Sequence, residues 1–274
     1  MPVAPAASGL ISVPSLILTF YRASAPALYT STPRTNMLIY NDSLWLSEQL
    51  PNVAVAYARL KLSVDADVKA LETFGKGAYS KELEAQKTIL SDLMDGAQGF
   101  LDCTEPPYSQ ECDIAIASTV DRLRYLDSEW RLVLSRSALL QSLGSLLATV
   151  INKMIIDIED MSNISDPQSQ RLAAFCGRIT LLGNLFIPQA GPAGGDEDLP
   201  PHTAIYTPGW LKFQYLANIL ESSLVDIKYL WIEGELGLEM TDDEVVGLIE
   251  ALFEDSDHRR RAIGEIRRHV VQQS

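Results

Sequence analysis

The sequence predicts an all-α protein, and three observations support this fold class. Apolar residues recur every three or four positions along most of the chain, which is the spacing of one face of an α-helix. Ser and Thr residues followed by Pro or by acidic residues recur as typical helix starts. No segment alternates apolar and polar residues over the length of a strand between turn residues. About eight to ten helices in series predict elongated antiparallel bundles that stack as a rod.

The first hundred or so residues predict four helices, which begin at Ser12, Thr35, Ser63 and Ser80. Pro14 falls in the first turn of the first helix, where its missing N–H costs nothing. We expect residues 75–77 (GKG) to separate the third helix from the fourth, because glycine is a poor helix former.

The middle of the chain predicts a loop at 103–111 and helices at 112–134 and 137–160. The second of these helices has two apolar stripes. One of them alternates spacings of three and four through Leu140, Leu143, Leu147, Val150 and Met154. A helix that is apolar on two stripes has to be covered on both, so we expect it to be central.

The C-terminal half predicts four more helices, which we place at 165–187, 207–231, 241–253 and from Ser256 onward. The first and third begin with a capping box, in which Ser or Thr is followed three residues later by Gln or Glu. The second holds seven apolar residues at alternating spacings of three and four from Trp210 to Trp231. With Tyr206, these tryptophans are either core residues or anchors of an interface.

We expect four parts along the chain. Residues 1–11 are predicted to be disordered, 12–187 to form a helical bundle, and 209–274 to form C-terminal helices that pack on the same rod. Residues 188–208 hold five prolines, three glycines and the acidic run 196–198 (DED), a composition that predicts a long mobile loop. Such a loop is either a tolerated insertion or a segment that orders on a partner.

The charge balance argues against some classes of partner. The chain has 22 Lys and Arg against 36 Asp and Glu, a net charge of −14. Nucleic acid and anionic membrane surfaces are therefore not expected partners of the protein as a whole. The apolar segment 6–20 is too short to span a membrane, follows no basic residue, and is interrupted by Pro14. We interpret this segment as a core helix and expect no direct membrane insertion.

The reactive residue types offer little chemistry. Cys103, Cys112 and Cys176 form no CxxC, which indicates free buried thiols in a reducing compartment, with a Cys103–Cys112 bridge open as an alternative in an oxidising one. No GxSxG, HExxH, Walker A or calcium-loop motif accompanies the three histidines, so we expect neither catalysis nor a cofactor. The acidic groups at 157–160 and 254–257 are interpreted as solvated helix ends rather than metal sites. A small helical hydrolase or lipid-binding bundle is the alternative class.

The C-terminal helix is basic in an otherwise acidic chain. Its five arginines, opposed by Asp257 and Glu265, give residues 257–274 a net charge of +3 and leave −17 for the remainder. This helix is either a docking element for an acidic partner or lipid headgroups, or it packs on the acidic segment 241–253 with its arginines in solvent.

Several short segments, in this order, resemble the Zeste-White 10 family: residues 36–46 (NMLIYNDSLWL), 130–134 (WRLVL), 144–147 (GSLL), 158–162 (IEDMS), 206–210 (YTPGW), and 251–253 (ALF) with Arg259 and Arg260. Each segment is a common helical pattern. Their order and spacing over about residues 12–270 carry the resemblance.

The resemblance implies a non-enzymatic scaffold, the C-terminal part of a helical rod in a Dsl-type tethering complex at the endoplasmic reticulum. Such a complex captures Golgi-derived COPI vesicles in retrograde transport and supports SNARE assembly. In animals the family also joins Rough Deal and Zwilch at kinetochores, in the spindle checkpoint and in dynein recruitment. The expected location is cytoplasmic and peripheral at the endoplasmic reticulum membrane, with kinetochores in mitosis as the alternative.

The resemblance also implies that this region binds an α-solenoid subunit, of the Rough Deal or neuroblastoma-amplified type. Other tether subunits and SNAREs would be met through the complex. We place the partner contact at Leu252, Phe253, Arg259 and Arg260, because a few aromatic, apolar or Arg anchors dominate most interfaces. The family's N-terminal coiled region has no match here and residues 188–208 have no counterpart, so no role is assigned to that loop.

Overall fold

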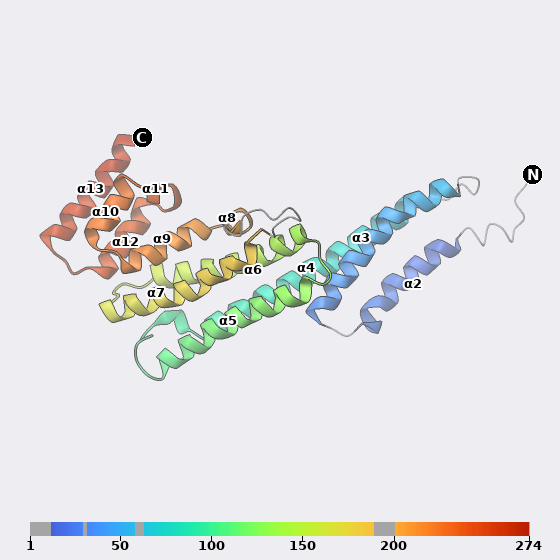
Figure 1. The fold of residues 1–274 in the computed structure, drawn as a ribbon, viewed down its shortest axis with the longest axis horizontal. Coiled ribbons are helices and arrows are strands. Elements are labelled where there is room, and N and C mark those ends of the chain that lie inside the picture. Colours follow the sequence, from blue (N-terminus) through green and yellow to red (C-terminus); the bar gives the residue numbers. More distant parts are fainter. Residues whose placement is uncertain (1–11, 30–31, 58–62, 189–200, 274) are drawn as a thin grey trace, which may run out of the picture. The chain divides into compact units, whose positions relative to one another are not determined.

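The computed structural model describes residues 12–29, 32–57, 63–188 and 201–273. Within these ranges every regular element is helical, with twelve α-helices and two short 3-10 helices (Figure 1). The all-α prediction is confirmed, and stacking of the bundles as a rod stays a prediction. The expected disorder of residues 1–11 and most of the expected loop at 188–208 lie outside the described residues.

The chain divides into two compact units. The first consists of Met1–Gln86 and Leu126–Leu139, and the second of Lys87–Tyr125 and Leu140–Ser274. The predicted parts had different boundaries, because they joined residues 87–125 and 140–187 to the N-terminal helices. In the second unit these residues group with the C-terminal helices, and helix α7 (Asp166–Thr180) packs extensively on α9 (Trp210–Glu221).

The first unit contains α2 (Val13–Leu28), α3 (Pro33–Ala56) and most of α4 (Asp65–Asp95). Helix α4 is unbroken, so the prediction of a break at residues 75–77 is wrong. The close approach of α3 explains the glycine there, since a Cβ on Gly75 would lie 2.9 Å from the Cβ of Ser43. The rings of Tyr40 and Tyr79, 4.9 Å apart, belong to the same α3–α4 contact.

Helix α2 is not the core helix that the sequence predicts. It is attached through one face, where Tyr21 meets Phe74 edge to face at 6.1 Å between ring centroids. Leu16, Ile17 and Phe20 on its other side are 64%, 61% and 71% exposed. In this chain the apolar stripe of α2 therefore faces solvent.

The second unit is built around α6 (Arg136–Glu159), whose larger part belongs to it. Both apolar stripes of this helix are buried, as predicted, through Leu140, Leu143, Leu146, Leu147, Val150, Ile151, Met154, Ile155 and Ile158. By length and composition alone α6 could cross a membrane, but 67% of its most apolar window is buried inside the protein. This burial is what the core helix of a packed bundle requires.

The C-terminal part of the second unit begins with the short helix α8 (Thr203–Tyr206), followed by α9 and by α10 (Leu224–Ile232). Helix α8 lies within the expected loop at 188–208. Thr203 of α8 is buried, and its hydroxyl donates a hydrogen bond to the carbonyl of Gly183 at 3.3 Å. The single helix expected at 207–231 is two helices. Ser223 ends the run because it caps α10 in a capping box with Asp226.

The remaining helices are α11 (Leu236–Glu239), α12 (Asp242–Leu252) and α13 (Asp257–Gln273). Helix α13 packs on both α10 and α12, and its Ala262 and Ile266 are buried. Trp210 and Trp231 are also buried, so the core interpretation of these two tryptophans is confirmed. Tyr206 stacks on Phe186, at 6.3 Å between ring centroids.

Candidate functional site

Three of the four predicted contact residues line one groove in the second unit. Leu252 ends α12, Phe253 follows it in an extended backbone conformation, and Arg259 lies in the first turn of α13. These residues, the loop 162–165 between α6 and α7, and the first two residues of α7 line a groove of about 610 Å³. We call it the Phe253 groove. Arg260 does not line it.

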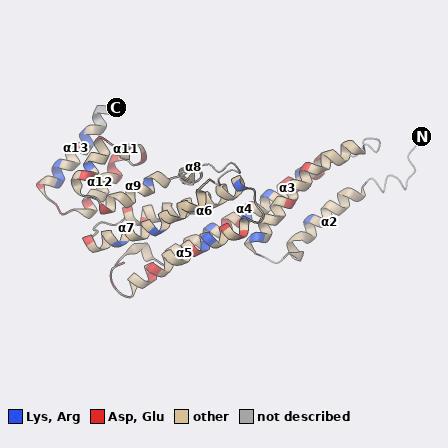
Figure 2. Cartoon of the chain, viewed as in Figure 1, with Lys and Arg blue, Asp and Glu red and all other residues tan. Residues whose placement is uncertain are grey.

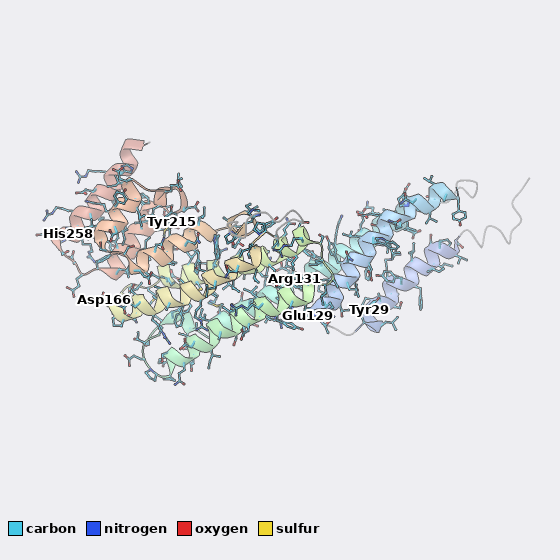
Figure 3. All side chains as sticks on the ribbon, in the orientation of Figure 1. Tyr29, Glu129, Arg131, Asp166, Tyr215 and His258 are labelled. Atoms are coloured by element: carbon cyan, nitrogen blue, oxygen red, sulfur yellow. The ribbon has the colours of Figure 1, made fainter. Side chains whose placement is uncertain are left out.

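A second hollow, of about 320 Å³, continues from this groove between α7 and the end of α9. The two hollows share Asp166, Leu252 and Phe253. Figure 3 labels Asp166 at the start of α7 and His258 at the start of α13. Segments that are nearly a hundred residues apart in the sequence therefore line one surface of the second unit.

Local hydrogen bonds fix the walls of the groove. The backbone N–H of Ile164 donates to the carbonyl of Ala251 at 2.8 Å, which joins the loop to the end of α12. The next residue, Ser165, begins α7 in the predicted capping box, where its N–H donates to Gln168 Oε1 at 3.0 Å. The hydroxyl of Ser169 donates to the carbonyl of Leu220 at 2.5 Å and ties α7 to the end of α9.

Arg259 has a structural role in the chain. Its Nη1 donates to the carbonyls of Phe253 and Glu250, at 2.7 and 3.2 Å, and its Nη2 pairs with Asp255 at 3.1 Å. The side chain is only 16% exposed. The guanidinium thus satisfies carbonyls at the end of α12, which no backbone N–H of that helix can reach.

Arg260 is different, because its side chain is 65% exposed. Its Nε and Nη2 contact Asp255 at 3.0 and 2.5 Å, and hydrogen bonding to Arg260 holds the pKa of that carboxyl below its usual value. Arg261, Arg267 and Arg268 are exposed as well, and Figure 2 shows these basic positions along α13. The packing of α13 on α12 is confirmed, but Arg259 is not in solvent as the packed interpretation has it. The exposed arginines leave the docking interpretation open.

Carboxylates dominate the rim of the groove. Asp166, Glu250 and Glu254 are exposed around it, and Glu221 is exposed at the adjoining hollow. Helices α9 and α12 end here while α7 and α13 begin here, so helix ends of both signs adjoin the surface and their partial charges offset each other. The excess of carboxylates on the rim is what makes the surface favour cations.

Elsewhere in the second unit, Lys212 of α9 bridges two helices. Its Nζ lies 2.9 Å from Glu159 at the end of α6 and 2.8 Å from Glu244 at the start of α12. Burial opposes the charge on Lys212, but the hydrogen bonds to the two carboxylates outweigh it and raise the pKa of Lys212. The same contacts, with those to Thr241, overcome the effect of burial on Glu244 and lower the pKa of its carboxyl.

The described residues hold no group of three His, Cys, Asp or Glu side chains placed to bind a metal ion. Cys103, Cys112 and Cys176 are free and buried, and burial raises the pKa of Cys176 to about 12. Burial, with the neighbouring Cys103, raises the pKa of Cys112 to about 11. Such thiols are poor nucleophiles at neutral pH.

Sequence reasoning missed the acidic rim and the loop of this groove. The capping box at Ser165 marks where α7 begins, but only the fold brings that point to Leu252 and Phe253. The fold and the groove together define an all-α protein with an acid-rimmed groove beside the C-terminal end of α12.

Residues 114–266, more than half of the chain, match the family model of the ZW10 C-terminal helical domain. The chain therefore belongs to the ZW10 family, and the resemblance noted in the sequence is confirmed.

Curated relatives agree with this membership. The chain is 24% identical over 202 residues to the centromere/kinetochore protein zw10 homolog of Mus musculus, which covers 73% of this chain and 26% of the relative. It is 25% identical over 268 residues to the centromere/kinetochore protein zw10 of Drosophila pseudoobscura pseudoobscura, covering 95% of this chain and 35% of the relative. The protein of the same name in Drosophila melanogaster is 24% identical over 266 residues, with 95% and 34% covered. The chain spans about a quarter to a third of the length of these relatives.

Proposed function

We propose that this chain is the partner-binding part of a non-enzymatic scaffold and that it binds an α-solenoid subunit through the Phe253 groove. The observation that carries the proposal is the groove itself, which gathers Leu252 and Phe253 with two helix ends on one open surface. Partly exposed aromatic and aliphatic side chains beside a hollow are the usual anchors of protein interfaces.

The names of the relatives favour a kinetochore role. The mouse and fly proteins are named as centromere/kinetochore proteins. The corresponding proposal is that the scaffold acts in the spindle checkpoint, joins Rough Deal and Zwilch, and recruits dynein at kinetochores in mitosis.

A tethering role is the second proposal, and it rests on the sequence resemblance to the Zeste-White 10 family. In this role the protein acts at the endoplasmic reticulum membrane in retrograde transport of COPI vesicles and in SNARE assembly. Both roles need the same kind of contact with a long helical subunit. The Phe253 groove serves either one.

The remaining alternatives fit the surface less well. A lipid-binding bundle would present cations to anionic headgroups, whereas Asp166, Glu250 and Glu254 surround this groove. A hydrolase needs positioned acid–base groups, and none of the three described histidines, His202, His258 and His269, lines the groove.

The test is affinity capture of the full-length protein, with identification of bound subunits by mass spectrometry. We expect a solenoid subunit with the wild type, a loss of at least tenfold with Phe253→Ala, and no loss with Val225→Ala. Val225 is an exposed apolar residue of α10 outside the groove and serves as the matched control. Undiminished capture by Phe253→Ala would remove the groove from the interface.

Imaging of the tagged protein separates the two roles. Signal at kinetochores in mitosis, lost on depletion of the captured subunit, supports the checkpoint role. Signal at the endoplasmic reticulum in interphase, with delayed return of Golgi cargo on depletion, supports tethering.

A further inference from the structure

We propose that the segment received by the Phe253 groove is cationic, with Lys or Arg side chains flanking an apolar side chain that packs on Phe253. This inference rests on the proposed function, because it names the chemistry of the partner segment at the same groove.

The first support is unpaired negative charge. The residues that line the groove and its adjoining hollow include Asp166, Glu221, Glu250 and Glu254, and none of these four forms an ion pair within the described ranges. The same lining contains a single basic residue, Arg259, whose guanidinium is already bound by its own chain. Other acidic residues of this unit, such as Glu159 and Glu244, have a lysine partner. The groove thus carries negative charge that the fold leaves uncompensated.

The second support is that the chain itself binds a guanidinium at this helix end. Arg259 donates to the carbonyls of Glu250 and Phe253. The partial charges of helix C-termini favour cations over the last turn, and Arg259 already offsets them at this end. A Lys or Arg of a partner would instead meet the rim carboxylates Glu250 and Glu254 from the open side.

The third support is the apolar part of the surface. Leu252 and Phe253 are half-buried, and both of them line the two hollows. A volume of about 610 Å³ has room for several side chains of an incoming segment. Apolar contact at the centre and charges at the rim are the usual arrangement of a specific interface. The occupant therefore needs both an apolar anchor and flanking cations.

The direct test measures the binding of a defined peptide to the unmodified protein. The probe is a fluorescein-labelled 18-residue amphipathic peptide of Lys and Leu, and its Glu and Leu counterpart serves as the opposite-charge probe. The variant Glu250→Gln/Glu254→Gln removes two carboxylates from the rim. The control Glu233→Gln/Glu235→Gln removes two exposed carboxylates outside it and so matches the change in net charge.

We expect the Lys–Leu peptide to bind by fluorescence anisotropy, and the rim variant to weaken it at least tenfold with less than a twofold effect of the control. Phe253→Ala should weaken the same peptide at least fivefold. Equal weakening by both charge variants would mean diffuse attraction to an acidic protein and would overturn the inference. Tighter binding of the Glu–Leu peptide, or no binding of either peptide, would also overturn it. Melting temperatures are compared so that a loss of fold is not mistaken for a loss of binding.

Capture of the solenoid subunit by the full-length protein separates this inference from the proposed function. If Phe253→Ala loses the subunit and Glu250→Gln/Glu254→Gln keeps it, the groove is the interface and its occupant is not cationic. If both variants keep the subunit, the proposed function fails at this groove.

Discussion

Gly144 of α6 and Tyr206 of α8 are in backbone contact. A Cβ added to Gly144 would lie 2.1 Å from the carbonyl oxygen of Tyr206 and 2.6 Å from its carbonyl carbon. No side-chain rotation can relieve such a contact, because both neighbouring atoms are backbone. The short helix α8 packs closely on α6, the core helix of the second unit, because Gly144 has no side chain at the contact.

Gly144→Ala should therefore destabilise the protein by about 1–3 kcal/mol, the usual cost of overpacking. The matched control is Gly247→Ala in α12, where an added Cβ meets nothing within 4 Å. That change should stabilise the helix by about 0.5–1 kcal/mol, because alanine loses less backbone entropy than glycine on folding. Urea unfolding followed by circular dichroism measures both, and a stable Gly144→Ala variant would contradict the close approach.

Lys212→Met should destabilise the protein by about 1–3 kcal/mol, because Glu159 and Glu244 would lose the ammonium group that pairs with both. Lys76→Met removes the exposed pair of Lys76 with Glu72 in α4 and should cost at most about 0.5 kcal/mol. Thermal unfolding at neutral pH compares the two variants. Equal effects would show that the bridge at Lys212 is no more than a surface ion pair.

The acid stability of the protein should depend on Glu244. Its pKa is lower in the folded protein than the ordinary value of 4.5, so its contribution is present above about pH 4.5 and is lost as the pH falls through the folded pKa. Glu244→Gln keeps the cap of α12 but removes the charge. The difference in unfolding free energy between wild type and Glu244→Gln should shrink from pH 6 to pH 3, and a constant difference would exclude this linkage.

The two neighbouring arginines of α13 should behave differently. Arg259→Ala removes the donor for the carbonyls of Glu250 and Phe253 and should cost about 1–3 kcal/mol. Arg260→Ala breaks only exposed contacts with Asp255 and Asp257 and should leave the melting temperature unchanged. Differential scanning fluorimetry separates these outcomes, and a neutral Arg259→Ala would rule out its capping role.

The three native thiols should be unreactive in the folded protein. Cys103, Cys112 and Cys176 are buried, and burial raises the pKa of each. We expect Ellman's reagent at pH 8 to label none of them within minutes and to label all three in urea. Ser80→Cys places an exposed thiol on α4 as the positive control. Rapid labelling of a native thiol would show that its surroundings open readily.

The fold class was predictable because the apolar spacing of each long helix is local information. The errors arose where tertiary packing or a cap overrides that pattern. At Gly75 the approach of α3 makes glycine the residue that fits within a continuous helix, whereas helix propensity alone predicts a break. At Ser223 the apolar spacing continues from Leu220 to Leu224 across the break, which hides the capping box that starts α10.

The candidate site was predictable only in part. Leu252 and Phe253 lie at the end of an apolar helix with a recognisable start, and the structure places both in a groove. The roles of Arg259 and Arg260 could not be told apart in the sequence. Their difference depends on which guanidinium reaches the carbonyls of α12, and this follows from the turn between α12 and α13.

The path of the chain has a consequence for anyone who divides this protein. It leaves the first unit within α4, returns to it within α5 (Tyr108–Trp130), and leaves it again within α6. A single proteolytic cut therefore cannot release either unit intact. A truncation at any one of these three crossings removes a helix from one of the two units. Domain exchange with a relative would have to transplant the whole interleaved region as one cassette.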